Sequence, residues 1–325
     1  MRGGLKMIKK IAVLTSGGDA PGMNACVRSV IRTCLYYGIE PYVVYDGFKG
    51  LVEGDIVQVD KKFTKDIINR GGTIILTSRL REFVNIDLQK KAIQNLKDRG
   101  IDALVGIGGD GTYRGLLDLA KLGFPVVGIP ATIDNDVAST DQTISFDTAL
   151  NTICNCVDKI KDTSSSHQRC SVIEVMGRHC GDLAIFSGIA EAAELTITYD
   201  YRESEQQIFK RLKEMHNKEK SHAIVIISEK LTDVNEFAKR IEKETGFETK
   251  AEILGRLQRG GGPTAEDRIL ASRFGTAAVT LLKKNVSGRV VGIKKNDIVD
   301  YPIEEAIHME RDIHKNLFNI INILQ

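Results

Sequence analysis

Short apolar runs rich in β-branched residues alternate with longer amphipathic segments along almost the whole chain. In the first half the strand-like runs lie at residues 11–14, 42–45, 103–107 and 125–129. Apolar residues recur at helical spacing between them, in segments 24–37, 86–99 and 112–121. Strands that alternate with helices are typical of a parallel sheet covered by helices, so we predict an α/β fold.

A second series of the same kind begins near residue 145. It has helical segments at 148–160, 181–193, 205–216 and 234–244, and strands at 170–175, 222–228 and 251–254. The chain of 325 residues is long enough for two domains. The pattern alone leaves open which sheet receives a late helix at 265–284 and a strand at 289–293.

Charge and cysteine content narrow the class of protein. The chain has 45 Lys and Arg against 43 Asp and Glu, a net charge of +2, which gives no general case for nucleic acid or an acidic membrane as partner. The six cysteines form no Cys-x-x-Cys pair, and the six histidines show no metal-ligand spacing. The apolar stretch 11–14 is too short for a signal peptide or a membrane span. We therefore expect a cytoplasmic protein with reduced thiols.

Two glycine-rich loops follow predicted strands and precede predicted helices, at residues 15–19 (Thr-Ser-Gly-Gly-Asp) and 106–112 (Gly-Ile-Gly-Gly-Asp-Gly-Thr). Ligands of open α/β sheets bind at the edge of the sheet where the strands end. Either loop alone could be a tight turn that needs glycine for positive φ. Two loops that would line one crevice favour a ligand site.

The second loop also matches the Gly-x-Gly-x-x-Gly dinucleotide pattern, so NAD is a rival ligand. Asp110 inside this loop would repel a pyrophosphate unless a divalent cation lay between them, which favours a magnesium-bound nucleotide. No Gly-x-x-x-x-Gly-Lys-Ser/Thr sequence occurs, which excludes a P-loop.

Asp134-Asn135-Asp136 ends the stretch 129–136, which directly follows the apolar run 124–128, where a strand should end. By itself this motif is ordinary turn chemistry, because Asx side chains bond to their own backbone. At the ligand-binding edge of a sheet, however, either aspartate could receive a proton from an acceptor hydroxyl during phosphoryl transfer.

Arginines recur beside small or glycine-rich loops at Arg169, Arg178, Arg256 and Arg259. Guanidinium groups bind phosphate bidentately, so the set indicates a polyanionic substrate. Arg28 and Arg32 lie one helical turn apart, which either marks a second anion site or is surface charge.

Five motifs in order carry a resemblance to a known family: residues 15–24 (Thr-Ser-Gly-Gly-Asp-Ala-Pro-Gly-Met-Asn), 108–112, 132–136 (Thr-Ile-Asp-Asn-Asp), 176–178 (Met-Gly-Arg) and 257–261 (Leu-Gln-Arg-Gly-Gly). The chain strongly resembles the bacterial ATP-dependent 6-phosphofructokinases from about residue 7 to its C-terminal helix, with residues 1–6 outside the family pattern. The resemblance implies two Rossmann-like three-layer αβα domains with mostly parallel sheets. It places residues 1–144 and about 257–307 in an ATP-binding domain, and 145–256 and about 308–325 in a fructose 6-phosphate-binding domain.

The resemblance also implies the reaction, which is transfer of the ATP γ-phosphoryl group to the 1-hydroxyl of fructose 6-phosphate in a magnesium-dependent, homotetrameric enzyme of glycolysis. Asp134 would be the general base, Asp110 the magnesium ligand, and Asp136, Thr132 and Arg178 the other catalytic residues. The ATP site would comprise Gly18, Arg79, Leu80, Gly109, Asp110, Gly111 and Thr112. The sugar-phosphate site would comprise Thr132, Ile133, Asp134, Arg169, Met176, Gly177, Arg178, Glu229, Lys250, Arg256, Leu257, Gln258 and Arg259, with Arg169 and Lys250 reaching in from a neighbouring subunit.

The resemblance further implies an effector site for ADP or phosphoenolpyruvate. Its residues would be Arg28, Arg32, Lys61, Asp66, Lys161, Glu194, Lys218, Lys220, Ser221 and His222. Lys61 and Lys161 stand where the family has arginines, and Ser221 where it has a lysine. We expect the allosteric response to be weaker than is typical of the family, or retuned.

The pyrophosphate-using branch of the family is the nearest alternative. It typically carries Asp at position 111 and Lys at position 131, where this chain has Gly111 and Ala131. An aspartate at 111 would fill and repel the space of the α-phosphate, so we expect ATP as the donor. Ala131 also differs from the glycine usual in the ATP branch.

Two further departures concern the sugar phosphate. Position 256 is Arg where the family usually has His, and position 250 is Lys where it usually has Arg. Lysine cannot make a bidentate fork to phosphate, so substrate affinity is affected more than the chemistry. A catalytically weakened regulatory paralogue is therefore a second alternative, although the presence of Asp110 and Asp134 argues against it.

Overall fold

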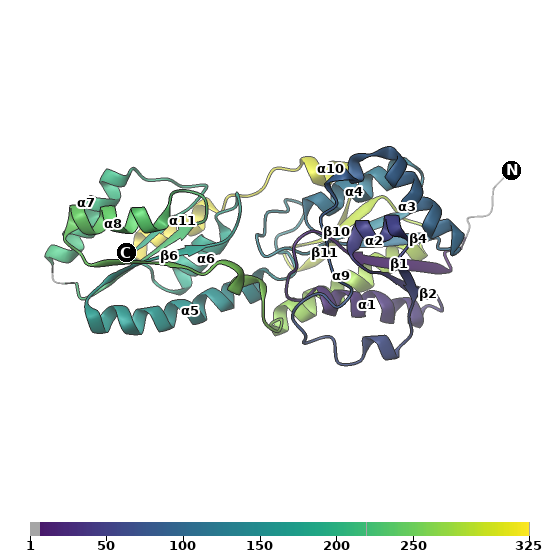
Figure 1. Cartoon of the computed structure of the whole chain (residues 1–325), viewed down its shortest axis with the longest axis horizontal. Helices are drawn as coiled ribbons and strands as arrows, with labels where there is room; N and C mark the ends of the chain where they lie inside the picture. Colours follow the sequence, from purple (N-terminus) through teal and green to yellow (C-terminus); the bar gives the residue numbers. More distant parts are fainter. Residues whose placement is uncertain (1–6, 219, 325) are drawn as a thin grey trace. The chain divides into compact units, whose positions relative to one another are not determined.

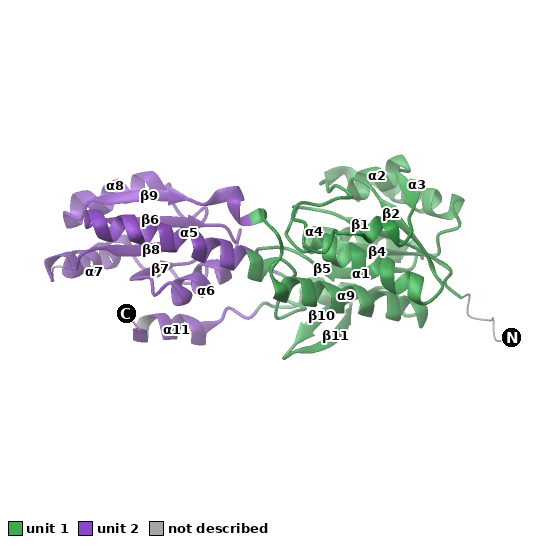
Figure 2. Ribbon diagram, turned by 90° about the horizontal axis from the view of Figure 1, so that it is seen from below, with its two compact units in different colours: residues 1–133, 137–148, 259–311 green, residues 134–136, 149–258, 312–325 purple. Residues whose placement is uncertain are grey.

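The structure is a computed structural model and describes residues 7–218 and 220–324. Its internal contacts divide the chain into two units, coloured green and purple in Figure 2. Unit 1 comprises the residues up to 133, 137–148 and 259–311, and unit 2 comprises 134–136, 149–258 and the residues from 312 on. Residues 1–6, predicted to lie outside the family pattern, are outside the described residues.

Unit 1 is built on a seven-stranded sheet with the order β11-β10-β5-β4-β1-β2-β3. Neighbouring strands are parallel except for the pairs β2–β3 and β10–β11 at the two edges. The predicted α/β fold with a mostly parallel sheet is confirmed. The strands are β1 (Lys10–Thr15), β2 (Glu40–Val44), β3 (Ile56–Gln58), β4 (Ala103–Gly108), β5 (Val126–Pro130), β10 (Arg289–Lys294) and β11 (Asp297–Pro302).

Helices cover both faces of this sheet (Figure 1). Helices α1 (Met23–Tyr36) and α9 (Ala265–Lys283) pack against each other on one face. The other face carries α2 (Gly47–Glu53), α3 (Ile86–Asp98), α4 (Asp110–Lys121) and α10 (Ile303–His308). These four bury side chains such as Phe48, Leu96, Leu116 and Ile303 in one core with the strands, because their apolar residues recur at helical spacing.

Unit 2 is built on a four-stranded, wholly parallel sheet with the order β7-β8-β6-β9. Its strands are β6 (Cys170–Val175), β7 (Leu195–Ile197), β8 (Ala223–Ser228) and β9 (Thr249–Ile253). Helices α7 (Glu205–Asn217) and α8 (Val234–Thr245) share a core with it through Leu212 and Phe237. Helix α6 (Asp182–Ala190) contacts β7 and β8, and α11 (Lys315–Leu324) contacts α6. Helix α5 (Phe146–His167) begins in unit 1 and continues in unit 2.

Several elements differ from the sequence prediction. The strands predicted at 42–45 and 251–254 lie at 40–44 and 249–253. The pattern missed β3 and β7, which have only three residues each, and β11, a partly exposed edge strand. Helix α9 and strand β10, whose sheet the sequence left open, both belong to unit 1. Residues 145–148 and 308–311 also lie in unit 1, and 134–136 and 257–258 in unit 2.

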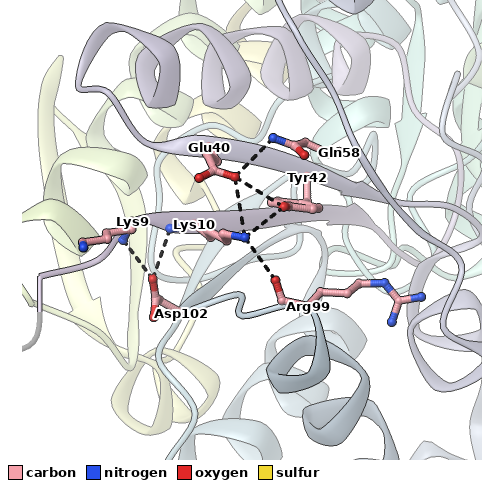
Figure 3. A network of polar contacts seen from close by, with 7 residues as sticks. All are labelled: Lys9, Lys10, Glu40, Tyr42, Gln58, Arg99 and Asp102. Carbon is pink, nitrogen blue, oxygen red and sulfur yellow. Dashed lines mark hydrogen bonds and ion pairs between the residues drawn. The ribbon is translucent and has the colours of Figure 1, made fainter.

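A network of hydrogen bonds and ion pairs lies at the amino ends of β1 and β2 (Figure 3). The Asp102 carboxylate accepts hydrogen bonds from the backbone amides of Lys9 and Lys10, at 2.9 and 3.1 Å. The Lys10 ammonium group donates to the Tyr42 hydroxyl at 3.3 Å and lies 3.6 Å from Glu40, and these contacts raise the pKa of Lys10, the Tyr42 bond most of all. Charges at this edge of the sheet therefore have partners within the protein.

All six cysteines lie in the described residues and carry free thiols. No helix among residues 7–218 and 220–324 is long and apolar enough to cross a membrane.

Candidate active site

The two glycine loops of unit 1 lie at the point where the strand order reverses. The chain runs from β1 outward to β2 on one side, whereas β4 and β5 lie on the other side of β1. The loops that follow β1 and β4 therefore leave neighbouring strands at the carboxyl edge, and the Ser16 amide donates to the Ile107 carbonyl at 3.0 Å. Open α/β sheets bind ligands at such a switch point.

Close approach of neighbouring atoms explains why position 108 of the second loop is glycine. A Cβ on Gly108 would lie 2.4 Å from the Ser16 carbonyl oxygen and 2.3 Å from the Thr112 hydroxyl. The Thr112 hydroxyl itself donates to the Ser16 carbonyl at 3.2 Å, which ties the two loops together. Gly109 precedes α4, so the first amides of that helix point toward any anion at the loop.

Asp110 and Gly111 open helix α4. Apart from the adjacent residues and the nearby backbone of α4 itself, no heavy atom of the described chain lies within 4 Å of the position that a Cβ on Gly111 would occupy. The described residues also contain no group of three or more His, Cys, Asp or Glu side chains placed to hold a metal. A magnesium ion at Asp110 would therefore take its other ligands from phosphate and water, as Mg²⁺ commonly does in nucleotide sites.

The loop that carries Arg79 and Leu80 is attached to the first glycine loop. The Gly17 amide donates to the Ser78 carbonyl at 3.2 Å, and Thr15 donates through its hydroxyl to the Leu76 carbonyl at 2.7 Å. Arg79 is exposed, and Leu80 packs in part against the core of unit 1.

Arg259, predicted for the sugar phosphate, lies against the first glycine loop. Its guanidinium donates to the Asp19 carbonyl at 3.2 Å, and a Cβ on Gly18 would lie only 2.5 Å from the same nitrogen. Both residues belong to unit 1.

The segment after β5 is held by backbone pairing. The Ala131 amide donates to the Gly108 carbonyl at 3.1 Å, and the Thr132 amide donates to the Ile144 carbonyl at 3.0 Å. Ala131 is buried, and Ile133, the last residue of this stretch in unit 1, is buried as well.

In unit 2, the loops after β6, β8 and β9 meet at the carboxyl edge of the sheet. The Met176 amide donates to the Gln258 side chain at 3.0 Å, and the Arg178 amide donates to the Glu229 carboxylate at 2.8 Å. Gly177 has φ 131°, and a Cβ there would lie 2.5 Å from the Cys180 carbonyl oxygen, so this tight loop requires glycine.

The Asp134-Asn135-Asp136 turn also belongs to unit 2. The Arg178 guanidinium lies 3.8 Å from the Asp136 carboxylate, which brings the arginine loop to the acidic turn. Asn135 has φ 52°, a left-handed conformation that Asn tolerates better than most residues. The structure thus brings together four predicted residues, namely Asp134, Asp136, Arg178 and Glu229.

Arg169 and Lys250 share one carboxylate. Arg169 pairs with Glu248 at 2.8 Å and Lys250 pairs with it at 3.5 Å. The contact with Arg169, more than that with Lys250, lowers the pKa of Glu248. Both cations lie at the outer strand β9 or beside it, and Arg256 and Leu257 are exposed in the following 3-10 turn, η3 (Gly255–Arg259).

The predicted effector residues fall into two groups, one in each unit. In unit 1, Arg32 donates to the Thr64 hydroxyl at 2.5 Å, beside Lys61 and Asp66, and Arg28 lies one turn earlier on α1. In unit 2, Lys161 pairs with Glu191 at 2.8 Å, and Glu194 pairs with Lys220 at 2.7 Å. The remaining members lie within two residues of Lys220 in the sequence: Lys218, Ser221 and His222.

Sequence reasoning missed the residues that fix the acidic turn. The Asn135 side chain donates to the Asp182 carboxylate at 2.9 Å, and His314 lies 3.3 Å from the same oxygen. Nothing in the spacing of these residues indicates their proximity.

A groove of about 570 Å³ between α9 and the β10–β11 hairpin contains none of the predicted site residues. Its lining side chains include Thr276, Leu281, Val291 and Ile298.

Two α/β units, one with paired glycine loops at a switch point and one with an arginine loop beside an acidic turn, define a protein of the class that binds nucleotides and phosphorylated ligands. Residues 10–282 match the family model described as Phosphofructokinase. The chain belongs to the phosphofructokinase family.

Curated relatives match over nearly the whole chain. It is 52% identical over 319 residues to the ATP-dependent 6-phosphofructokinase of Photobacterium profundum, covering 98% of this chain and 100% of that protein. It is 51% identical over 315 residues to the same-named protein of Vibrio vulnificus, covering 97% and 98%. The solved structure of phosphofructokinase from Saccharomyces cerevisiae has a TM-score of 0.85 and 33% identity. That match covers 97% of this chain but only 46% of the yeast chain.

Proposed function

We propose that the protein is an ATP-dependent 6-phosphofructokinase. It transfers the γ-phosphoryl group of MgATP to the 1-hydroxyl of fructose 6-phosphate, giving fructose 1,6-bisphosphate and ADP, as a cytoplasmic enzyme of glycolysis. About half of all residues match those of the bacterial relatives that carry this name, over nearly the full length of both.

The open space at Gly111 is the observation that carries the choice of donor. A nucleotide phosphate beside the first turn of α4 needs room and helix amides, and this position offers both. An aspartate there would place a second carboxylate next to Asp110 and repel the phosphate. Ala131 is small and buried, so no ammonium group stands at that position for a pyrophosphate donor.

Most of the residues proposed for each substrate lie in one unit, although Thr132, Ile133 and Arg259 of the sugar-phosphate site lie in unit 1. The glycine loops of unit 1 cradle the phosphates with main-chain amides, and Asp110 would hold magnesium together with phosphate oxygens. Magnesium supplies charge neutralisation on the phosphates. Asp134 accepts the proton of the 1-hydroxyl as its oxygen forms a bond to the γ-phosphorus and the bond to ADP breaks. Arg178, held at Asp136, stabilises negative charge on the transferred group.

We also propose a homotetramer in which Arg169 and Lys250 serve the sugar-phosphate site of a neighbouring subunit. Their shared partner Glu248 lies next to β9, an edge strand of the unit 2 sheet, so both cations are placed where another copy could reach them. Light scattering should give about four times the chain mass of 35.9 kDa.

For regulation, we propose that ADP or phosphoenolpyruvate acts through the residues of the predicted effector site. Lys161 and Glu194 already pair with Glu191 and Lys220, so an effector must compete with these ion pairs. We expect a response to ADP smaller than is typical of the family at subsaturating sugar phosphate.

The test of the proposed function is an assay for fructose 1,6-bisphosphate with MgATP as donor, repeated with magnesium pyrophosphate. Turnover with MgATP alone is expected. Turnover with pyrophosphate alone would identify the other branch of the family. Binding of fructose 6-phosphate without turnover on either donor would identify a regulatory paralogue.

A further inference from the structure

The acidic turn is fixed by the side chain of its middle residue. Asn135 is buried and has φ 52°, and its amide nitrogen donates to the Asp182 carboxylate at 2.9 Å. The Cys180 thiol lies 3.9 Å from the backbone carbonyl oxygen of Asn135, to which it donates at the limit of a sulfur hydrogen bond. Because Asp134 and Asp136 flank Asn135, the direction of both carboxylates depends on where this side chain is held.

Asp182 is the first residue of α6, and its side chain is only 1% exposed. A buried carboxylate is costly unless hydrogen-bond donors surround it. One oxygen of Asp182 faces two partners, the Asn135 amide at 2.9 Å and the His314 ring nitrogen Nε2 at 3.3 Å. His314 therefore gives the Asp182 carboxylate another polar partner and helps to hold it in place for Asn135.

The ring of His314 is itself fixed by unit 2. It lies edge-on to Phe186, one turn further along α6, at 5.5 Å between ring centres and an angle of 88°. Its backbone amide donates to the Asp312 carboxylate at 3.1 Å, and its carbonyl accepts from the Leu317 amide at 2.9 Å at the start of α11. A backbone φ of 49° at His314 turns the chain sharply at this point.

Helix α11 holds this arrangement from the other side. It packs on α6, and its Phe318 stacks on Tyr201 at 4.2 Å with nearly parallel rings. The C-terminal segment therefore reaches Asp182 through a side chain that α11 positions. The contact joins residues 182 and 314, far apart in the sequence, to the turn at 134–136.

We propose that His314 is a positioning residue for phosphoryl transfer, acting through Asp182 and Asn135 on the acidic turn. The proposal rests on the proposed role of Asp134 as general base. His314 holds Asp182, Asp182 holds Asn135, and Asn135 sets the direction in which Asp134 meets the sugar hydroxyl. The C-terminal segment is thereby part of the machinery that orients the base, and not only a cover for α6.

The experiment measures kcat and both KM values of the full-length enzyme with MgATP and fructose 6-phosphate. His314→Ala should lower kcat about tenfold, within the roughly 100-fold that a misplacement of about 1 Å can cost. Both KM values should stay within about twofold, because the substrate-binding side chains are untouched. His314→Gln keeps an N–H donor near the position of Nε2 and should recover most of kcat.

A matched control is His308→Ala, which removes another histidine of the C-terminal region. His308 is exposed, and its ring contacts the carbonyl of Glu304 within its own helix, so kcat should not change. Thermal unfolding of each variant shows that it is folded. Should His314→Ala fold poorly, Asp182→Asn, which preserves the shape of the side chain, tests the same contact from its other partner.

A double-mutant cycle tests whether His314 acts through the turn. Asn135→Gly removes the side chain and suits a positive φ. If His314 acts through Asn135, the double variant loses no more kcat than the worse single variant. Losses that multiply, wild-type kcat in His314→Ala, or failure of His314→Gln to recover activity would overturn the proposal.

Asp134→Asn, measured in parallel, distinguishes failure of the positioning role of His314 from failure of the proposed role of Asp134 as general base. If Asp134→Asn keeps its turnover, the assignment of the base fails and the positioning role fails with it. If Asp134→Asn loses turnover while His314→Ala keeps it, only the positioning role is wrong.

Discussion

The two units prepare for phosphate in different ways. In unit 1 the proposed donor site is made of glycines and main-chain amides, and its loops bond to each other through Ser16, Ile107 and Thr112. The unit 2 part of the proposed sugar-phosphate site includes cationic side chains that already pair with carboxylates, Arg178 with Asp136 and Arg169 with Glu248. Unit 1 therefore offers a preformed cradle, whereas unit 2 must exchange ion-pair partners when a phosphate binds.

The acidic turn of unit 2 should show the largest effect of any single change. Asp134→Asn should lower kcat by at least the roughly 100-fold expected for loss of a general base, with both KM values nearly unchanged. Steady-state kinetics check this. The control is Asp141→Asn, whose carboxylate pairs with Lys294 at 2.9 Å and should matter little for turnover. Near-normal kcat in Asp134→Asn would rule out the role.

Asp267, a buried acid in unit 1, gives a prediction for how the stability of the protein depends on pH. Asp267 accepts bonds from the amides of Ser145 and Thr148 and from the Thr148 hydroxyl, yet burial raises its pKa from 3.8 to about 6. Between pH 4 and 6 the folded protein holds a proton that the unfolded chain releases, so stability falls as pH rises through this window.

Relative to Asp267→Asn, the wild type should therefore lose about 2–3 kcal/mol of unfolding free energy between pH 4 and pH 7. Denaturant unfolding of both proteins at the two pH values measures this difference. Equal changes in unfolding free energy with pH in the two proteins would show that burial does not raise the pKa of Asp267.

Substitution of one glycine in each unit allows a direct comparison of how much stability the loops of the two units lose. Gly177→Ala in unit 2 combines φ 131° with a Cβ 2.5 Å from a backbone oxygen, and should destabilise the protein by about 2 kcal/mol. Gly17 in unit 1 has φ 95°, but apart from its own and the adjacent residues no described atom lies within 4 Å of an added Cβ, so Gly17→Ala should cost about 1 kcal/mol. Unfolding free energies of the two variants give the order, and the reverse order would contradict the contact argument.

At position 111 of the proposed donor site, KM for MgATP should depend on the charge of the side chain but not on its volume. Gly111→Asp should raise KM for MgATP about tenfold or more, because a carboxylate would face the phosphates at close range. Gly111→Ala should leave it within about twofold, since the space there is open. If both variants raised KM equally, volume and not charge would govern this position.

The smallest effect should come from Lys250. Lys250→Arg supplies a bidentate fork and should lower KM for fructose 6-phosphate about two- to fivefold, with kcat unchanged. Substrate titration at saturating MgATP measures it, and Lys243→Arg on α8 is the control. An unchanged KM would mean that Lys250 does not meet the phosphate.

Local pattern was enough to predict most of the fold. Helix α3 begins one residue after Asn85, which caps it, and its apolar residues recur at helical spacing, so its bounds were readable from sequence. Strand β11 was not readable, because an edge strand with partly exposed residues lacks a buried apolar run. The strands β3 and β7 are too short to give a pattern.

Only part of the candidate site could be predicted from the sequence, because some of its contacts join segments that are far apart in the chain. A glycine loop between strand and helix is a local signal, so the edge at which Gly109 lies could be predicted. The pairing of Arg169 with Glu248, and the contacts of Asn135 with Asp182 and of Asp182 with His314, depend on how distant segments pack. No sequence spacing encodes such contacts.

The most direct test of this division between the units is a comparison of KM values in two variants, one from each unit. Gly111→Asp should raise KM for MgATP and leave KM for fructose 6-phosphate nearly unchanged. Arg169→Ala should do the reverse. If both variants raised the KM of the same substrate, the assignment of donor to unit 1 and sugar phosphate to unit 2 would be wrong.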